Sequence, residues 1–317
     1  MPIHSPVFFL EYTLSTRRSL IKGSTGLNTV VDPVRVDYDW RTGISDLAVA
    51  VNVSIDQSKR INRRTGRTLK QSGDCHSMFC DGGECVFAKD SKLYSLGSDL
   101  TSNSLLTSLS TNDFLSYAQV GDRIYYTNGL DLGYVEEGAN NTWAKTTDYV
   151  GPTSRRYLEG PFAGNHLAYR DGRMFISKDN VVWYSEYLSV DWYRKAKNFI
   201  MLDSFVRMIK PVRDGIFVST EKKIYFFHGE TAPTFAKKTV ASYPALEWSE
   251  CIEYLDGESF PDLGFSGPCA LWVTAEGAMV GSPTGAVKNL NREKVIYPSG
   301  TRGRSLVRGL NFIHTLE

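Results

Sequence analysis

A chain of 317 residues is about twice as long as a typical single domain, although one β architecture can reach this size. The chain is 42% hydrophobic and 12% aromatic with a formal net charge of +1, which excludes a disordered, collagen-like or strongly basic nucleic-acid-binding protein. No run approaches the roughly 18 apolar residues of a membrane span, so we expect neither a signal peptide nor a membrane anchor. Five cysteines form no dense disulfide framework and indicate synthesis in a reducing cytosol.

Residues 1–46 are expected to form an N-terminal arm that ends in a closing strand. Within them, Val34–Tyr38 alternates as an edge strand does. The apolar C-terminal stretch Leu306–Leu316 is its expected partner, because pairing of the two ends would complete a blade and remove exposed sheet edges. Residues 47–317 are then expected to form a β-propeller.

A basic run begins shortly after the alternating stretch Leu47–Ile55, which we interpret as an early repeat unit. In Lys59–Lys70, six of the twelve residues are basic, and Thr65-Gly66 predicts an exposed hairpin or loop. Three roles stay open for the run: a solvated strand edge, a contact with an acidic neighbouring subunit, or non-specific contact with DNA phosphates. The candidate contact residues are Lys59, Arg60, Arg63, Arg64, Arg67 and Lys70.

The clearest local pattern is an antiparallel meander in His166–Leu188. Three short stretches rich in aromatic and β-branched residues are separated by Asp171-Gly172, which suits a tight hairpin, and by the turn-forming Lys178–Asn180. One meander cannot bury both of its faces, so it requires stacked copies.

Copies of this meander occur in both directions along the chain. They lie at Cys75–Leu96, Val120–Val135, Val212–Phe227 and Ala270–Leu290. If Gly83, Gly121, Gly172, Gly215 and Gly277 mark equivalent first turns, the steps are 38, 51, 43 and 62 residues, near the length of a propeller blade. With Leu47–Ile55 as an earlier unit, the fold class is all-β, a propeller of about six blades (five to seven) with little helix.

Two segments between the copies are interpreted as connectors. Thr101–Asn112 is rich in Ser and Thr, and Ser189–Asn198 is the best candidate for one short helix. No segment sustains a long 3.6-residue period.

The cysteines invite a metal or disulfide hypothesis. Cys75, Cys80 and Cys85 are spaced C-x4-C-x4-C beside His76, a spacing that does not match a zinc knuckle. Cys80 and Cys85 flank a four-residue loop and are expected to face each other on paired strands. We expect them to be reduced and packed, with an oxidised pair and a metal site as alternatives.

The sequence displays no marked catalytic constellation. It lacks G-x-S-x-G and a P-loop, and its five histidines are scattered. Ser177–Trp183 resembles a degenerate Asp box of sialidase-type propellers, a structural motif, and no carboxylate pair is marked out for a glycosidase. We therefore expect no enzymatic activity, catalytic residue, cofactor or metal.

Several phrases in order resemble the propeller-bearing tail proteins of tailed bacteriophages. They include STGLNTVVDPVRVD, LAVAVNVSIDQSKRINRRTGR, CHSMFCDGGECVFAKDSKLYSL and GAVKNLNRE, and the resemblance extends from about Gly23 to about Glu293. That family includes tail-hub, nozzle and packaged-DNA-stabilising components of the virion.

The resemblance implies a structural virion protein, a ring-forming component of the tail or head–tail junction that assembles in the bacterial cytoplasm. Its implied partners are further copies of itself, other tail or portal-complex proteins and packaged DNA. The alternative is an adhesin for host surface glycan, in which Trp143, Trp192 and Tyr193 would stack on sugar rings; a glycosidase is a further alternative.

Overall fold

A computed structural model describes residues 22–317, apart from 37, 57, 82–83, 102, 148, 150, 152–153, 230, 258–263, 292–293, 298–299, 301 and 310. The chain divides into two compact units, Met1–Gly66 and Arg67–Glu317. The division falls after Gly66 and not after residue 46 as expected, because Leu47–Ile55 belongs to the first unit.

The first unit contains a small mixed sheet and a hairpin. The sheet has the order β1-β3-β2, with β1 (Gly23–Leu27) parallel to β3 (Ile44–Leu47) and β2 (Tyr38–Asp39) antiparallel to it. The hairpin pairs β4 (Val53–Ile55) with β5 (Ile61–Arg63). The Leu47–Ile55 stretch is therefore split between two short strands, and its interpretation as a blade is wrong.

The expected edge strand at Val34–Tyr38 is also largely wrong. Pro33–Arg35 form a short 3-10 helix that begins after Asp32, whose side chain accepts a hydrogen bond from the Val34 backbone. Proline at the first position favours this turn. Asp37 lies outside the described residues, and only Tyr38 enters a strand.

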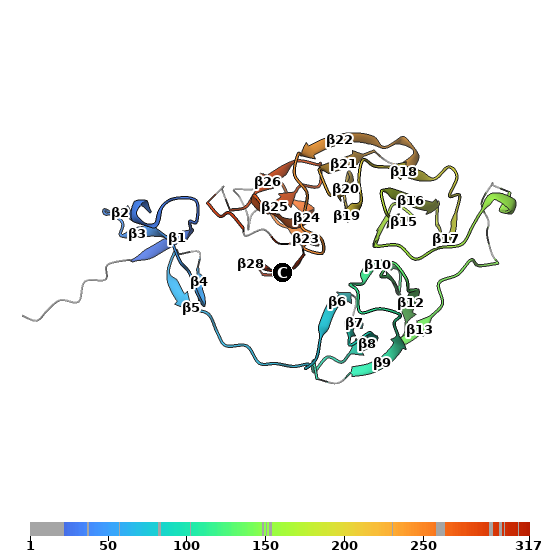
Figure 1. Cartoon of the computed structure of the whole chain (residues 1–317), viewed down its shortest axis with the longest axis horizontal. Helices are drawn as coiled ribbons and strands as arrows, with labels where there is room; N and C mark the ends of the chain where they lie inside the picture. The colour runs from blue at the N-terminus through green and yellow to red at the C-terminus, as the bar shows by residue number, and fades with distance from the viewer. Residues whose placement is uncertain are drawn as a thin grey trace, which may run out of the picture. The chain divides into compact units, whose positions relative to one another are not determined.

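The second unit is a β-propeller of five antiparallel blades, which Figure 1 shows in chain order around the ring. Blade 1 contains β6 (Cys75–Asp81), β7 (Glu84–Lys89), β8 (Lys92–Leu96) and β9 (Asn103–Ser108). Blade 2 contains β10 (Ser116–Val120), β11 (Arg123–Thr127), β12 (Leu132–Glu136) and β13 (Ala139–Asn141). Blade 3 contains β14 (His166–Arg170), β15 (Arg173–Lys178), β16 (Val181–Glu186), β17 (Ser189–Tyr193) and β18 (Phe199–Met201).

Two further blades follow along the chain. Blade 4 contains β19 (Val206–Val212), β20 (Gly215–Thr220), β21 (Ile224–His228) and β22 (Ala236–Ala241). Blade 5 contains β23 (Cys251–Leu255), β24 (Gly267–Thr274), β25 (Gly277–Gly281) and β26 (Val287–Asn289). The remaining helical turns in the described residues are η2 (Arg155–Tyr157) and η3 (Ala232–Thr234). The all-β propeller is therefore confirmed, and its five blades are the lower end of the expected range.

The turns of the third blade match the sequence pattern. Asp171 and Gly172 take φ values of 48° and 73°, and Asp179 takes 53°, the left-handed conformations that tight turns require. Gly277 is not a first turn, because it joins β24 to β25 and not β23 to β24. This misplacement accounts for the long last step in the glycine spacing.

Apolar clusters hold each blade to the next. One cluster joins Val86 and Leu93 of blade 1 to Ile124 of blade 2, and similar clusters join blades 2 and 3, 3 and 4, and 4 and 5. Burial of this apolar surface is the main stabilising contribution to the ring.

A C-terminal hairpin takes the place of a shared cluster between blades 5 and 1. Strands β27 (Gly303–Arg308) and β28 (Asn311–Leu316) pair with each other, and Val307 and Phe312 pack against the core of blade 5. The expected pairing of the C-terminal stretch with Val34–Tyr38 is wrong, since β2 pairs with β3 in the first unit.

Candidate functional site

The basic run occupies an exposed position in the chain. Residues 61–70 are all exposed, and the boundary between the two units falls inside them. Ile61–Arg63 form the second strand of the β4–β5 hairpin, and the residues after Arg63 form no further strand until β6. The expected exposed hairpin is therefore present, although it pairs Val53–Ile55 with Ile61–Arg63, so that Thr65-Gly66 lies beyond its strands.

Backbone contacts fix the start of the run. Lys59 has a φ of 65°, and its carbonyl oxygen accepts a hydrogen bond of 2.7 Å from the Ser24 backbone in β1. A Cβ atom at Gly23 would lie 2.5 Å from the same oxygen, so this position requires glycine. The turn itself is held by Asp56, whose Oδ1 accepts a hydrogen bond from the Arg60 backbone at 2.9 Å. The hairpin is thus anchored through its backbone, and its side chains stay available.

The six cations of the run carry no neutralising partner within the described part of the chain. Lys59, Arg60, Arg63, Arg64, Arg67 and Lys70 form no ion pair there and are all exposed. Twelve residues without an acidic side chain carry six positive charges. Such a segment attracts any anionic surface, whether protein or nucleic acid.

The first unit also exposes apolar side chains. Val34 is 93% exposed and Trp40 76%, and the arginine after Trp40 places its guanidinium carbon 5.3 Å from the indole centroid. Other exposed apolar residues of this unit are Val30, Val31, Val49, Val51 and Ile61. Its buried side chains are mostly polar, namely Ser24, Asn28, Ser45 and Asp46. All six apolar core clusters of the described residues lie in the second unit.

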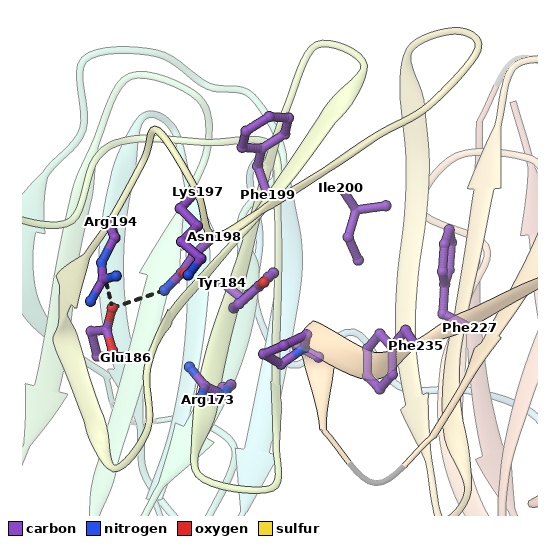
Figure 2. Close-up of a pocket in the computed structure, with 12 residues that line it drawn as sticks. Arg173, Tyr184, Glu186, Arg194, Lys197, Asn198, Phe199, Ile200, Phe227 and Phe235 are labelled. Atoms are coloured by element: carbon purple, nitrogen blue, oxygen red, sulfur yellow. Dashed lines mark hydrogen bonds and ion pairs between the residues drawn. The ribbon is translucent and has the colours of Figure 1, made fainter.

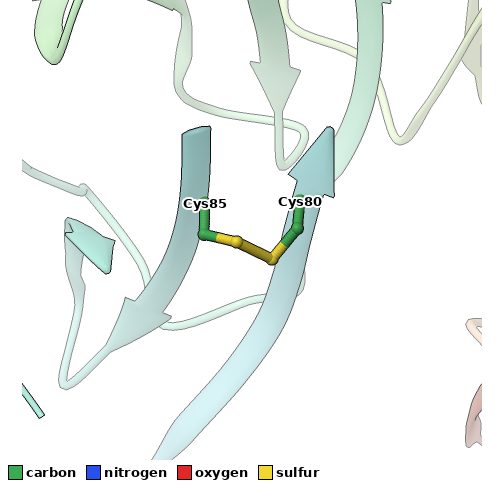
Figure 3. Close-up of a disulfide and its surroundings, with 2 residues drawn as sticks. All are labelled: Cys80 and Cys85. Atoms are coloured by element: carbon green, nitrogen blue, oxygen red, sulfur yellow. A yellow bond between two sulfur atoms is a disulfide. The ribbon is translucent and has the colours of Figure 1, made fainter. Parts of the chain in front are cut away.

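The cysteine prediction is partly wrong. Cys80 and Cys85 do lie opposite each other on β6 and β7, as expected, but they form a disulfide and are not reduced (Figure 3). Their Cα atoms are 4.1 Å apart, because directly opposed residues of an antiparallel pair lie close together. Cys75 is a free thiol, as are Cys251 and Cys269. Within the described ranges, no group of three or more His, Cys, Asp or Glu side chains is arranged to hold a metal ion.

The aromatic residues of the glycan-adhesin alternative are not available for stacking. Trp143, Trp192 and Tyr193 are all buried, and the indole nitrogen of Trp143 donates to Asp191 at 2.8 Å. They pack inside blades 2 and 3, so this placement of a glycan site is wrong.

A partly buried ionic cluster joins three consecutive blades and was missed by the sequence reasoning. The ring nitrogens of His166, which is 1% exposed, lie 3.7 Å from Glu247 Oε1 and 3.9 Å from Glu250 Oε1. Lys210 Nζ lies 3.7 Å from the same Glu250 oxygen, and the imidazole packs on Trp248 with centroids 4.6 Å apart. Burial alone would raise the pKa of Glu247, but the neighbouring His166 and the charges of Arg302 and Arg207 lower it.

This cluster ties β14 of blade 3 and β19 of blade 4 to the segment that enters blade 5. His166, Lys210 and Glu250 are 40 to 84 residues apart along the chain, roughly the spacing of one or two blades. Both described contacts of Glu247 with the hairpin are made by its backbone, through a parallel bridge to Arg302 and a hydrogen bond of 2.9 Å from Gly303. The arrangement stabilises the ring near its closure.

Comparisons with known proteins give only structural likenesses. No family model matches the chain, and no curated protein matches it.

Within the described residues, no helix has the length and apolarity to cross a bilayer.

Three similar solved structures illustrate the extent of the likeness. The WD40 domain of Pan2 from Neurospora crassa is 10% identical over 76% of this chain and 71% of its own, with a TM-score of 0.43. A gluconolactonase from Xanthomonas campestris is 12% identical over 64% and 70%, with a TM-score of 0.42. The extracellular domain of a hybrid two-component system from B. thetaiotaomicron is 13% identical, with a TM-score of 0.42. The match covers 70% of this chain and 27% of that chain, so this chain spans about a quarter of the length of that structure. Likenesses of this size say nothing about activity or partners.

Proposed function

We propose that the chain is a structural subunit of a tailed bacteriophage, a ring-forming component of the tail or head–tail junction. The observation that carries the proposal is the exposure of apolar side chains in the first unit, together with the basic run that begins in that unit and whose six cations are exposed and form no ion pair within the described residues. An exposed surface of this kind is typical of a protein interface. The sequence phrases that resemble propeller-bearing tail proteins support the same role.

The proposed occupant of this surface is a second copy of the chain. Removal of the six cations of the run from the 36 Lys and Arg leaves 30, against 35 Asp and Glu, so the rest of the chain carries a net charge of −5. A basic segment on one subunit and an acidic remainder on the next are complementary, and a head-to-tail contact between copies generates a ring when the rotation closes.

The experiment is a measurement of mass in solution by light scattering and of shape by electron microscopy, over a range of protein and salt concentrations. We expect rings or oligomers that dissociate as salt rises, and we expect Val49→Ser with Val51→Ser to give monomers. Lys222→Ser, an exposed change within a turn of blade 4, is the matched control. A chain that stays monomeric at high concentration and low salt would contradict self-assembly.

The virion setting needs a second measurement. The genes that flank the coding sequence are expected to encode portal and tail proteins, and co-expression with those proteins should give a complex that contains this chain. Flanking genes of unrelated metabolism and no co-purification would overturn the phage assignment without affecting the self-assembly result.

A further inference from the structure

A pocket lies between blades 3 and 4. It has a volume of about 550 Å³, within the range of small-molecule sites. Blade 3 contributes side chains from β15, β16, β18 and the loop before β18, and blade 4 contributes Phe227 and the η3 turn (Figure 2). The floor is rigid, because Tyr184, Phe227 and Ala232 belong to the apolar cluster that joins the two blades.

The pocket carries an excess of positive charge. Its charged lining residues are three cations, Arg173, Arg194 and Lys197, and one anion, Glu186. Arg194 Nε lies 3.5 Å from Glu186 Oε1, and the same oxygen accepts a hydrogen bond of 3.0 Å from Asn198, as Figure 2 shows. No carboxylate in the described part of the chain pairs with Arg173 or Lys197, so two cations face the pocket without a neutralising partner.

Arg173 is held in place by neutral groups. Its Nη1 donates to the Ser185 carbonyl oxygen at 2.6 Å, and its guanidinium carbon lies 5.5 Å from the Tyr184 ring centroid and 5.8 Å from that of Tyr187. Stacking on aromatic rings orients the guanidinium plane without consuming its charge. A pre-oriented guanidinium is well suited to bind a carboxylate through two parallel hydrogen bonds.

The rest of the lining points to a ring-shaped ligand with hydroxyl groups. Phe199, which is 39% exposed, and Ile200 present apolar surface on one side. Both described contacts of Glu186 use Oε1, which leaves Oε2 to accept a hydrogen bond. A carboxylate oxygen in a cationic pocket can accept hydrogen bonds from the hydroxyl groups of a ligand.

A second pocket continues the first along the same loop. It measures about 440 Å³ and is lined by Arg156, Tyr157, Glu159, Arg194 and Ala196. Arg194 lines both pockets, and Tyr157 is exposed. Two adjacent pockets that share one arginine suit successive units of a polymer better than one isolated molecule.

We propose that these two pockets bind an acidic polysaccharide, with a carboxylated sugar held by Arg173 and Lys197 and its neighbour near Tyr157. The ligand class follows from the unpaired cations, the apolar wall and the free carboxylate oxygen together. The inference does not rest on the assembly role, since none of these residues lies in the first unit.

Titration calorimetry with oligogalacturonate, a chain of carboxylated sugars, tests the proposal. We expect binding that Lys197→Glu weakens about tenfold or more, because an exposed cation becomes an anion at the ligand carboxylate. Lys222→Glu makes the same charge change outside the pockets and should leave the affinity unchanged. Both lysines are exposed, so both variants should have the same melting temperature as the unchanged protein.

Three further probes can overturn the proposal. The neutral methyl ester of the same oligosaccharide should bind at least about tenfold more weakly. Equal binding of the ester, or displacement of oligogalacturonate by inorganic phosphate, would exclude recognition of a carboxylated sugar. Single-stranded DNA whose binding depends on Lys197 would reassign the pockets to nucleic acid, and a protein that binds none of these would leave no ligand site.

Discussion

The guanidinium carbon of Arg304 lies 4.4 Å from the centroid of the Phe114 ring, and Arg304 Nη1 donates to the Cys75 carbonyl oxygen at 3.3 Å. One side chain of the C-terminal hairpin therefore contacts both the first strand of blade 1 and the segment that leads into blade 2. Phe114 also contacts Trp248, with ring centroids 5.6 Å apart, at the entry to blade 5. These contacts close the ring where no apolar cluster is shared by blades 5 and 1 within the described residues.

Replacement of Arg304 by alanine should lower the free energy of unfolding by about 1–3 kcal/mol, since a cation–π contact and a charged hydrogen bond are both lost. Chemical denaturation monitored by tryptophan fluorescence measures the change. Arg308→Ala, an exposed position on the same strand, should have little effect and is the control. Equal stability of the two variants would show that Arg304 does not contribute to closure.

Deletion of Leu306–Glu317 should lower the melting temperature substantially. The reason is the loss of the β27–β28 hairpin from the edge of blade 5, where Val307 and Phe312 pack on the core. It is not the loss of a shared terminal blade, the arrangement expected from the sequence. An unchanged melting temperature would mean that the five blades close without the hairpin.

Inner strands were predicted well because they are buried on both faces. In blade 3 the three stretches expected within His166–Leu188 correspond to β14, β15 and β16, since aromatic and β-branched residues between turn signals mark a buried strand. The fourth strands of blades 1 to 4 were missed, whereas the copy Ala270–Leu290 includes β26 of blade 5. β9 is mostly exposed and rich in Ser and Thr, so Thr101–Asn112 resembled a connector.

The one expected helix is wrong for a related reason. Ser189–Asn198 contains β17 followed by turns, because Trp192 and Tyr193 are both buried and a strand with an irregular register can place them there. The exposed basic run was found from composition alone, since unpaired charge is a local property. The His166 cluster could not be found, because its carboxylates come from another part of the chain and become neighbours only when the ring closes.

Acidification should destabilise the protein through Glu247. Its pKa in the folded chain is lower than the ordinary value of 4.5, so its contribution is complete above that pH and is lost as the pH falls through the lowered value. His166, Glu250, Lys210, Arg302 and Arg207 are the charged or titratable groups around it. Glu247→Gln should reduce the dependence of the free energy of unfolding on pH below 4.5, whereas Glu276→Gln, at an exposed turn, should not. If the free energy of unfolding of the two variants depended on pH in the same way, Glu247 would not be the source of the acid destabilisation.

Reduction of the Cys80–Cys85 disulfide should cost about 2 kcal/mol of stability, the chain-entropy value for a loop this short. Thiol titration of the denatured protein should give three thiols before reduction and five after it. Cys80→Ser should remove the difference, and Cys75→Ser should preserve it. Five thiols in unreduced protein would show that Cys80 and Cys85 are reduced, as expected from the sequence.

Elemental analysis of the purified protein is expected to show no stoichiometric zinc.

The basic run gives the most direct test of the role in assembly. Arg63, Arg64 and Arg67 are exposed, and the hairpin is held by backbone contacts of Lys59 and Asp56. Replacement of the three arginines by serine should therefore leave the isolated chain folded, with an unchanged melting temperature. The same change removes three of the six charges of the run.

We expect the triple variant to fail in ring formation and in incorporation into particles, because the charge that attracts the neighbouring copy is halved. Electron microscopy of the purified chain and of particles made with the variant measures both effects. Measurement of DNA binding across a salt series distinguishes contact with DNA from contact with a protein partner. Each lost phosphate contact should lower the magnitude of the slope of log affinity against log salt by about 0.7 to 0.9. Salt-sensitive assembly without DNA affinity supports a protein partner, and a DNA slope that falls in the variant supports contact with packaged DNA. Normal rings and normal, DNA-filled particles would show that the run is a solvated strand edge.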